Sequence, residues 1–294
     1  MKALIFIYPL IALLILTVNA AASGDFIMDN LSSDIIGYVV THKIRDKETL
    51  IELAREYDVG YNEITAANKE VDPWVPERGA EIILPTAWVL PSVSDNEIII
   101  NLAEMRLYYF FTAGASKYVT TYPIGIGREG FSSPGGSFTI TARVKDPVWT
   151  VPEHIRQEAP ELPPVVPPGP ENPLGKYWIQ LSVNGYGLHG TNRPYGIGRK
   201  ISHGCIRLYP EDIQRLYKIT SIGIPVRIIN EPVKIGKHEG RIYIEVHGSN
   251  MDESELLHLS FIKITEKHLL KYVDTSLIMN EVKRSTGLPA IISN

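Results

Sequence analysis

Three side chains in one stretch of this 294-residue chain are suited to nucleophilic chemistry. Cys205 is the only cysteine, and His189 and His203 precede it by no more than sixteen residues. A cysteine attacks as the thiolate, so it needs a base or a positive field nearby, and an imidazole can be that base at neutral pH. We therefore take Cys205 as the candidate nucleophile and His189 as its candidate base.

The residues beside these three supply further groups that acyl transfer needs. If His189 meets the thiol, the two form a thiolate–imidazolium pair, and the carbonyl of Gly190 would hold the other ring nitrogen. Backbone amides around Gly204 and Cys205 would stabilise the oxyanion of an acyl-transfer intermediate. The planar guanidinium of Arg207 would pair with a substrate carboxylate.

A metal site is the main alternative for the same side chains, because imidazole and thiolate both bind zinc. The spacing of His189, His203 and Cys205 matches no common set of zinc ligands, and the sequence offers no evident fourth ligand. We expect neither a metal nor another cofactor.

The first 22 residues predict export. Lys2 is followed by an apolar run to Val18 and then by small residues, the pattern of a secretory signal peptide over residues 1–22. An uncleaved membrane anchor is the alternative, although the run is short for a bilayer span. Exported proteins usually pair their cysteines, so a single one indicates a reactive thiol or an intermolecular bridge; a buried inert thiol is the remaining interpretation.

Charge and length limit the classes of function. The formal net charge is −4, and no tail or block concentrates Lys and Arg. Nucleic-acid binding calls for a concentrated cationic surface, so we expect no nucleic-acid partner. The length allows two modest domains, and nothing after the signal peptide is apolar for long enough to span a membrane.

Residues 38–85 predict a small strand–helix–helix–strand module. A strand over 38–42 precedes helical spacing over 47–57, with Thr49 as the N-cap, a second helix over 61–68 and a strand over 80–85. Residues 23–37 show little pattern and are expected to be a leader. Residues 86–96 carry one proline, Pro91, and are expected to be a linker.

Residues 97–230 predict a mainly β domain that carries the candidate site. Strands are expected over 97–102, 106–110, 118–127 and 177–181, with a helix over 210–217 after Cys205. Residues 125–130 spell GxGxxG, but no helix pattern follows, so a dinucleotide site is rejected. The proline-dense residues 151–175 form either the edge of a binding site or a passive surface strap.

The last part of the chain, residues 231–294, predicts a strand over 241–246 and helices over 252–272 and 275–286. We expect a small α/β appendage packed on the preceding domain, and its role is not legible from the sequence.

Residues 98–230 resemble the catalytic domain of L,D-transpeptidases, the YkuD domain. The resemblance rests on His189 and on the run Ser202–Arg207, and it extends over residues 101–108, 122–130, 166–170, 172–175 and 189–198. It is similar in particular to the Gram-negative ErfK/YbiS-like branch. Residues 38–85 resemble a LysM domain, which binds the N-acetylglucosamine-containing glycan of cell walls. Asp46–Leu50 replaces the usual Gly-Asp-Thr-Leu, so a module that only packs on its neighbour remains the alternative.

These resemblances imply an α+β, mainly β chain: a βααβ LysM-like module, a β-sandwich-like catalytic domain and the α/β appendage. They imply that Cys205 attacks the amide between meso-diaminopimelate and the terminal D-alanine of a peptidoglycan tetrapeptide, forming a thioester that an amine resolves. His189 would be the base and Gly190 the orienting carbonyl. The other site residues implied, for the substrate and oxyanion sites, are His203, Gly204, Arg207, Ser202 and Tyr195.

The same resemblances imply the setting of the reaction. The protein would act in the periplasm, with peptidoglycan stems and glycan as partners, and carbapenems would acylate Cys205. The acceptor would be a second diaminopimelate, a lysine of an outer-membrane lipoprotein, or water in an L,D-carboxypeptidase side reaction. A wall-binding protein with an inactive catalytic relic and a papain-type peptidase are the alternative classes.

Overall fold

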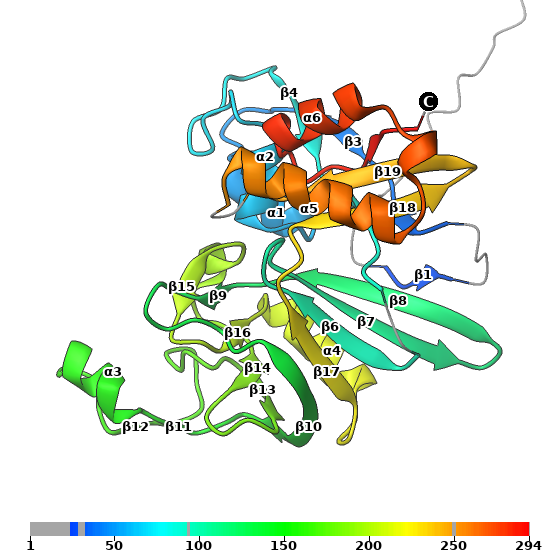
Figure 1. The fold of residues 1–294 in the computed structure, drawn as a ribbon. Helices are drawn as coiled ribbons and strands as arrows, with labels where there is room; N and C mark the ends of the chain where they lie inside the picture. Colours follow the sequence, from blue (N-terminus) through cyan, green and yellow to red (C-terminus); the bar gives the residue numbers. More distant parts are fainter. Residues whose placement is uncertain (1–23, 29–32, 93–94, 249–250, 294) are drawn as a thin grey trace, which may run out of the picture.

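The computed structural model describes residues 24–28, 33–92, 95–248 and 251–293, and its fold is mixed α+β, mainly β (Figure 1). We call residues 38–85 the first module, 97–230 the central domain, 151–175 the insertion and 231–294 the appendage. The predicted signal peptide lies outside the described residues. Among the helices that are described, none has both the length and the apolar character needed to cross a membrane.

The central domain is built on one continuous nine-stranded sheet that curls on itself. Its fifth to seventh strands explain the curl, because the long strand β10 pairs with β17 through Gly136–Thr139 and with β13 from Ile140 onward, and a β-bulge lies between Ile140 and Ala142. The sandwich-like body thus comes from one bent sheet and not from two separate ones. The strand order is β1 (Phe26–Ile27), β8 (Ser116–Pro123), β7 (Arg106–Ala113), β6 (Glu97–Asn101), β17 (Pro225–Ile229), β10 (Gly136–Lys145), β13 (Tyr177–Leu181), β14 (Gly187–His189) and β16 (Ile206–Arg207).

Strands β6 and β7 are apolar on both faces because each face meets a different core. Ile98 and Ile100 point into the core of the central domain, whereas Ile99 and Tyr108 belong to the core shared with the first module. Side chains alternate between the two faces of a strand, so burial on both faces requires a nearly continuous apolar run. The central domain and the first module are thus packed into one body.

The first module has the order of elements expected from the sequence. β3 (Val40–Lys43) pairs antiparallel with β4 (Glu81–Leu84), and α1 (Leu50–Glu56) and α2 (Tyr61–Ala67) lie between them in the chain. Thr49 is the N-cap of α1 and forms a capping box with Glu52. The backbone amide of Leu50 donates to the carbonyl of Pro73, at 3.0 Å, which joins the loops that precede α1 and follow α2.

The predictions of a patternless leader and a plain linker were wrong. In the leader, β1 adds to the edge of β8, and β2 (Ile35–Gly37) pairs with β5 (Ala87–Val89) of the linker. Strands of two or three residues are too short to show a period in the sequence. They form because partner edges and an apolar surface for Phe26 are available in the folded chain.

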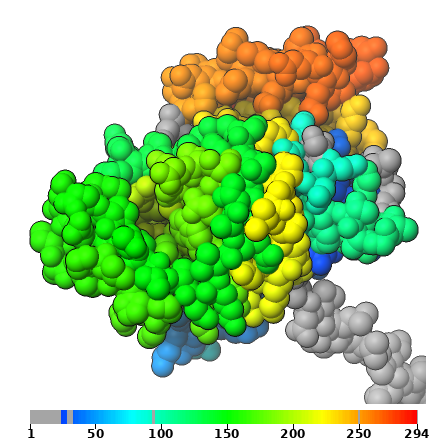
Figure 2. Space-filling model, turned by 90° about the horizontal axis from the view of Figure 1, so that it is seen from below, coloured from blue at the N-terminus to red at the C-terminus, as the bar shows by residue number. Residues whose placement is uncertain are grey.

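The appendage has its own apolar core and lies along one side of the molecule, as the orange segments in Figure 2 show. One predicted helix, over 252–272, is broken where His268 takes a left-handed conformation with φ of 55°. The appendage docks on both the leader and the linker: the amide of Asp34 donates to the carbonyl of Lys237 at 2.7 Å, and the amide of Val89 donates to the carboxylate of Glu245. Its elements are β18 (Val233–His238), β19 (Arg241–Val246), β20 (Ala290–Ile291), α5 (Glu253–Glu266), η2 (Leu270–Tyr272) and α6 (Thr275–Arg284).

The insertion projects from the central domain, at the lower left of Figure 1 and the left of Figure 2. It contains a short helix that the proline content hid, α3 (Glu153–Glu158), which starts directly after Pro152 and has no proline of its own. β11 (Trp149–Thr150) pairs with β12 (Val165–Val166) at its base.

The remaining elements lie around the candidate site. β9 (Ile126–Gly127) pairs in parallel with β15 (Lys200–Ser202), η1 (Pro194–Gly196) precedes β15, and α4 (Pro210–Ile219) follows β16. A turn and not a helix follows the GxGxxG segment, since the amide of Phe131 donates to the carbonyl of Arg128. The rejection of a dinucleotide site is therefore consistent with the fold.

Candidate active site

Two parallel strands place the candidate catalytic residues side by side. β14 and β16 pair so that Leu188 lies opposite Ile206 and His189 lies opposite Arg207. Leu188 and Ile206 point into the apolar core, so their neighbours His189 and Arg207 share the other face of the sheet. Cys205 directly precedes β16, and its thiol is close enough to Arg207 for that charge to lower its pKa.

His189 is held in a fixed orientation. Its Nδ1 lies 2.6 Å from the carbonyl oxygen of Gly190, the contact expected from the sequence. The ring is 3% exposed and stacks on Trp178, its cross-strand partner in β13, with ring centroids 5.6 Å apart. With Nδ1 donating to the carbonyl, Nε2 is the nitrogen left to accept a proton.

The protonation states differ from the ion pair expected. Burial, with the charge of Arg207 adding to it, lowers the pKa of His189 to about 3. Burial also raises the pKa of the Cys205 thiol. A hydrogen bond with the Gly187 backbone and the charge of Arg207 act in the opposite direction. Both shifts favour a neutral thiol beside a neutral imidazole. Within the described chain the thiol donates weakly to the carbonyl of Gly185, at 3.5 Å, and no hydrogen bond joins it to His189.

Hydrogen bonds within the loop before β16 change two predicted roles. The hydroxyl of Ser202 is buried, donates to the carbonyl of Cys205 at 2.6 Å and accepts from the amide of Gly204 at 3.1 Å. Ser202 therefore shapes the loop and is not placed to bind substrate, and the amide of Gly204 is already engaged. The amide of Cys205 is left as the candidate oxyanion donor.

The conformation of this loop depends on Gly204. Its φ is +104°, and a Cβ there would meet a ring carbon of Tyr186 at 2.5 Å. Any larger residue would strain the backbone and displace the ring, so the sequence Gly204-Cys205 fits this turn for a steric reason.

His203 faces the insertion and not the thiol. Its Nε2 lies 3.0 Å from a carboxylate oxygen of Glu158, at the end of α3, and 3.0 Å from the guanidinium of Arg128. Glu158 and Arg128 also form an ion pair, and the ring of Phe131 packs edge-on against His203 at 4.9 Å. These contacts hold the insertion next to the loop that carries Cys205.

Arg207 and Tyr195 complete the predicted set, in different places. In the described part of the chain the Nε of Arg207 is buried without a hydrogen-bond partner, and burial lowers the pKa of its guanidinium. Tyr195 lies in η1, is 54% exposed and is close enough to Arg55 of the first module to raise the pKa of that guanidinium. Arg207 is thus brought together with His189, whereas Tyr195 faces the first module.

Sequence reasoning missed Trp178 and Glu158. Trp178 could have been found by counting back through the turn from His189, because residues directly opposite in a hairpin contact each other. Glu158 gave no comparable signal, since it contacts His203 only through the three-dimensional placement of the insertion.

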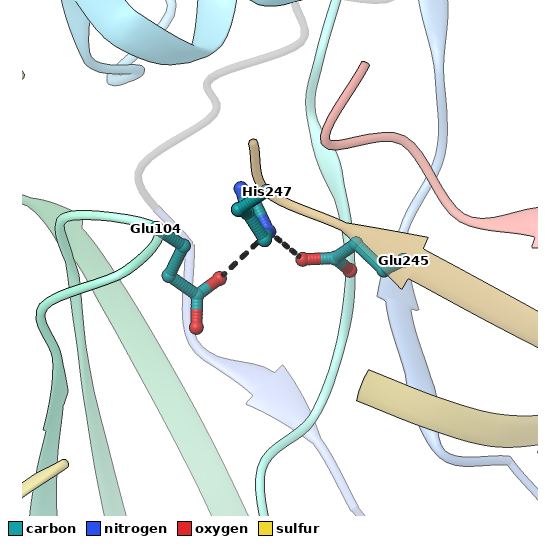
Figure 3. Close-up of side chains that lie close together, drawn as sticks. All are labelled: Glu104, Glu245 and His247. Carbon is teal, nitrogen blue, oxygen red and sulfur yellow. Dashed lines mark hydrogen bonds and ion pairs between the residues drawn. The ribbon is translucent and has the colours of Figure 1, made fainter. Parts of the chain in front are cut away.

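One other cluster in the described residues has side chains of the types that bind metals: Glu104, Glu245 and His247 (Figure 3). It already holds a cation, because the buried ammonium of Lys234 lies 2.7 Å from an oxygen of each carboxylate. His247 Nε2 contacts Glu245 at 2.6 Å. The cluster is a buried ion network that joins the appendage to the β6–β7 turn.

The curled sheet, the buried oriented imidazole and the cysteine two residues before its cross-strand partner Arg207 describe a candidate site for acyl transfer. Comparison with known proteins identifies the family to which the chain belongs. Residues 95–228 match the family described as the L,D-transpeptidase catalytic domain, YkuD.

The chain is 36% identical over 276 residues to the probable L,D-transpeptidase ErfK/SrfK of Salmonella typhimurium, covering 89% of this chain and 88% of that one. It is 39% identical over 225 residues to the probable L,D-transpeptidase YcfS of Escherichia coli, covering 73% and 70%. The chain belongs to the L,D-transpeptidase family, whose members are acyltransferases that act on peptidoglycan.

Solved structures of similar fold are weaker matches. The structure of the Ldtfm–avibactam carbamoyl enzyme is 20% identical, with a TM-score of 0.38, and the match covers 53% of this chain and 55% of that one. The assignment to the family therefore depends on the sequence relatives.

Proposed function

We propose that this chain is a periplasmic L,D-transpeptidase that uses Cys205 as its nucleophile. The observation that carries the proposal is the β14–β16 pairing, which sets the oriented His189 beside Arg207, two residues from the only cysteine. The family assignment supports the substrate class, a tetrapeptide stem of peptidoglycan.

The reaction would proceed in two balanced steps. The sulfur of Cys205 attacks the carbonyl carbon of diaminopimelate, the thiol proton passes to Nε2 of His189, and that proton then goes to the departing amino group of D-alanine. In the second step an acceptor amine attacks the thioester, its proton passes to His189, and the thiolate of Cys205 leaves and is reprotonated. Desolvation of His189 makes it a weak base at rest, so this transfer would be coupled to the formation of the tetrahedral intermediate.

Other residues would hold the substrate and its developing charge. The amide of Cys205 would face the oxyanion, and the unpartnered Nε of Arg207 would meet a carboxylate of the stem. Arg128, Glu158 and His203 would fix the insertion as one wall of the cleft. Trp178 would keep the His189 ring in its plane.

We further propose that the first module binds wall glycan in the manner of a LysM domain. Its strand–helix–helix–strand order and the adjacency of its two loops support this, as does Trp74, which is 58% exposed in the loop after α2. An exposed aromatic ring offers a stacking surface for a sugar. Residues 1–22 would act as the export signal, and the acceptor would be diaminopimelate, a lipoprotein lysine or water.

Intact mass spectrometry of the mature chain tests the proposed chemistry. Incubation with disaccharide-tetrapeptide should add the acyl mass and release D-alanine, and an added amine should then discharge the adduct into a joined product. Cys205→Ala should form no adduct, and His189→Gln should form it much more slowly. A carbapenem should acylate the same residue. A wild-type chain that binds isolated wall but never acquires an adduct would refute the proposal in favour of a binding protein.

A further inference from the structure

A pocket of about 860 Å³ lies where the first module, the central domain and the appendage meet. Its walls come from α2, from residues 198–201 and from the ends of α5 and α6, and neither Cys205 nor His189 lines it. Volumes of this size are typical of sites for small ligands. It is therefore a concave site separate from the residues around the nucleophile.

The charge of the pocket is positive. Four of its lining residues are basic: Lys69, Arg199, Lys200 and Lys283. Of the two acidic ones, Glu63 is engaged on both oxygens by Arg106 and by other donors, which leaves only Glu253 to offset the cations. An anionic ligand fits this balance of charge.

Arg199 has hydrogen-bonding capacity that the protein does not use. Its guanidinium carbon lies over the ring of Tyr61, 3.6 Å from the ring centroid, and 5.7 Å from the centroid of Trp74. Its Nε and one terminal nitrogen are buried without a hydrogen-bond partner among the residues that the structure describes. Buried N–H groups are rarely left unpaired, and the planar guanidinium matches a carboxylate in two parallel bonds.

The pocket is connected to the catalytic loop through the chain itself. The carbonyl of Arg199 accepts from the amide of Ile126 at 3.1 Å, and β15 then continues into Ser202, whose hydroxyl holds Cys205. A ligand on Arg199 would thus bind the segment that leads directly into the nucleophile loop. Apolar side chains also line the pocket, among them Ile201, Met251 and Leu256, and they would contact the aliphatic part of the ligand.

We infer that this pocket binds a carboxylate-bearing peptide stem of peptidoglycan outside the reaction cleft, with Arg199 as the principal carboxylate ligand. The identity of the ligand as peptidoglycan rests on the proposed function. Its carboxylate is inferred from the unpaired guanidinium of Arg199 and the basic lining of the pocket. Such a site would hold a second stem of the wall while the first reacts at Cys205.

Hydrogen–deuterium exchange of the full mature chain carrying Cys205→Ala tests the inference, with disaccharide-tetrapeptide as the probe. The ligand should protect two regions, the turn around residues 185–190 at the cleft and the α2 and α6 segments at the pocket. Arg199→Gln should reduce protection at α2 and α6 strongly but keep it at 185–190. Affinity at the pocket should fall roughly tenfold, the loss expected for one charge-assisted hydrogen bond.

Two further variants distinguish a loss of ligand binding from a loss of folding. Lys283→Gln removes an exposed pocket cation and should weaken pocket protection severalfold, whereas Lys218→Gln removes an exposed cation on α4 and should leave it unchanged. Pocket protection should also decrease with added salt.

The outcomes separate the two proposals. Acylation of Cys205 in the wild type without any protection at α2 and α6, or equal protection in Arg199→Gln, would overturn this inference alone. Equal protection by an uncharged N-acetylglucosamine oligomer would overturn the assignment of a carboxylate ligand. Failure of the wild type to be acylated would instead count against the proposed function.

Discussion

The pH dependence of Cys205 alkylation is the most direct measure of the electrostatics at the candidate site. Cys205 is the only cysteine, so iodoacetamide reports on a single thiol. The pKa of that thiol is raised above its ordinary value of 9.0 by burial, and the pKa of His189 is lowered to about 3. The two pKa values therefore differ by at least 6. Transfer of the thiol proton to the imidazole costs roughly 8 kcal/mol before any attraction between the two ions is counted.

This difference favours the neutral thiol and the neutral imidazole in the free enzyme. Less than about 1% of the thiol is ionised at pH 7 when its pKa is above 9.0. The alkylation rate should therefore rise about tenfold per pH unit between pH 6 and 8, without a plateau. His189→Gln should have the same slope, because a neutral imidazole adds no positive field.

Arg207 provides the matching perturbation. Its charge lowers the pKa of both Cys205 and His189, so Arg207→Gln should slow alkylation at every pH below 9, while Lys218→Gln should follow the wild type. The rate is obtained by intact mass spectrometry after quenching at timed intervals. A plateau between pH 5 and 8 that disappears in His189→Gln would refute this account and establish the thiolate–imidazolium pair.

Three further predictions concern stability and the insertion. Lys234→Met should lower the free energy of unfolding, measured in urea, by about 3–5 kcal/mol, because it leaves two buried carboxylates without a cation. A loss below about 1 kcal/mol would contradict the conclusion that Lys234 neutralises these carboxylates. The pKa of His189 is near 6.5 in the unfolded chain and about 3 in the folded protein, so the folded protein loses stability as the pH falls below 6.5, by up to roughly 5 kcal/mol at pH 3. In urea titrations, the stability of His189→Gln should therefore depend less on acid than that of the wild type. An unchanged acid dependence would mean that the ring is not buried in its neutral form. Glu158→Gln should speed limited proteolysis within residues 151–175 without altering Cys205 alkylation, and identical cleavage rates would show that the contacts with Arg128 and His203 do not hold the insertion.

The elements that the sequence predicted well are those with a strong period or a defined cap. The first module followed from the helical spacing over 47–57 and from Thr49, whose side chain does cap α1. The hairpin over 97–110 followed from two apolar runs around a turn. In these segments local chemistry and tertiary packing favour the same structure.

The failures occur where a segment takes its structure from a distant partner. β1 exists only because β8 leaves an edge open, and β2 only because β5 runs beside it. At the site, the Gly190 contact could be predicted because it joins neighbouring residues, whereas the displacement of His203 toward Glu158 depends on where the insertion folds. The role assigned to Ser202 changed for a similar reason, since its hydroxyl is used by the turn it belongs to.

Residues 101–108 resemble the family although they lie outside the catalytic loop. Their contacts give this resemblance a structural explanation. Within it, Glu104 reaches Lys234 of the appendage at 2.7 Å, and Arg106 reaches Glu63 of the first module at 2.8 Å. All four side chains are buried, so each pair would leave an uncompensated charge if either neighbour were to detach.

The β6–β7 hairpin is therefore the joint at which all three parts of the chain meet. The pocket inferred above lies at the same joint, since both Glu63 and Ala103 line it. A ligand held there would contact all three parts at once, and through β15 it would also contact the segment that leads to the nucleophile. This arrangement gives the first module and the appendage a physical route to influence Cys205 without either of them entering the reaction cleft.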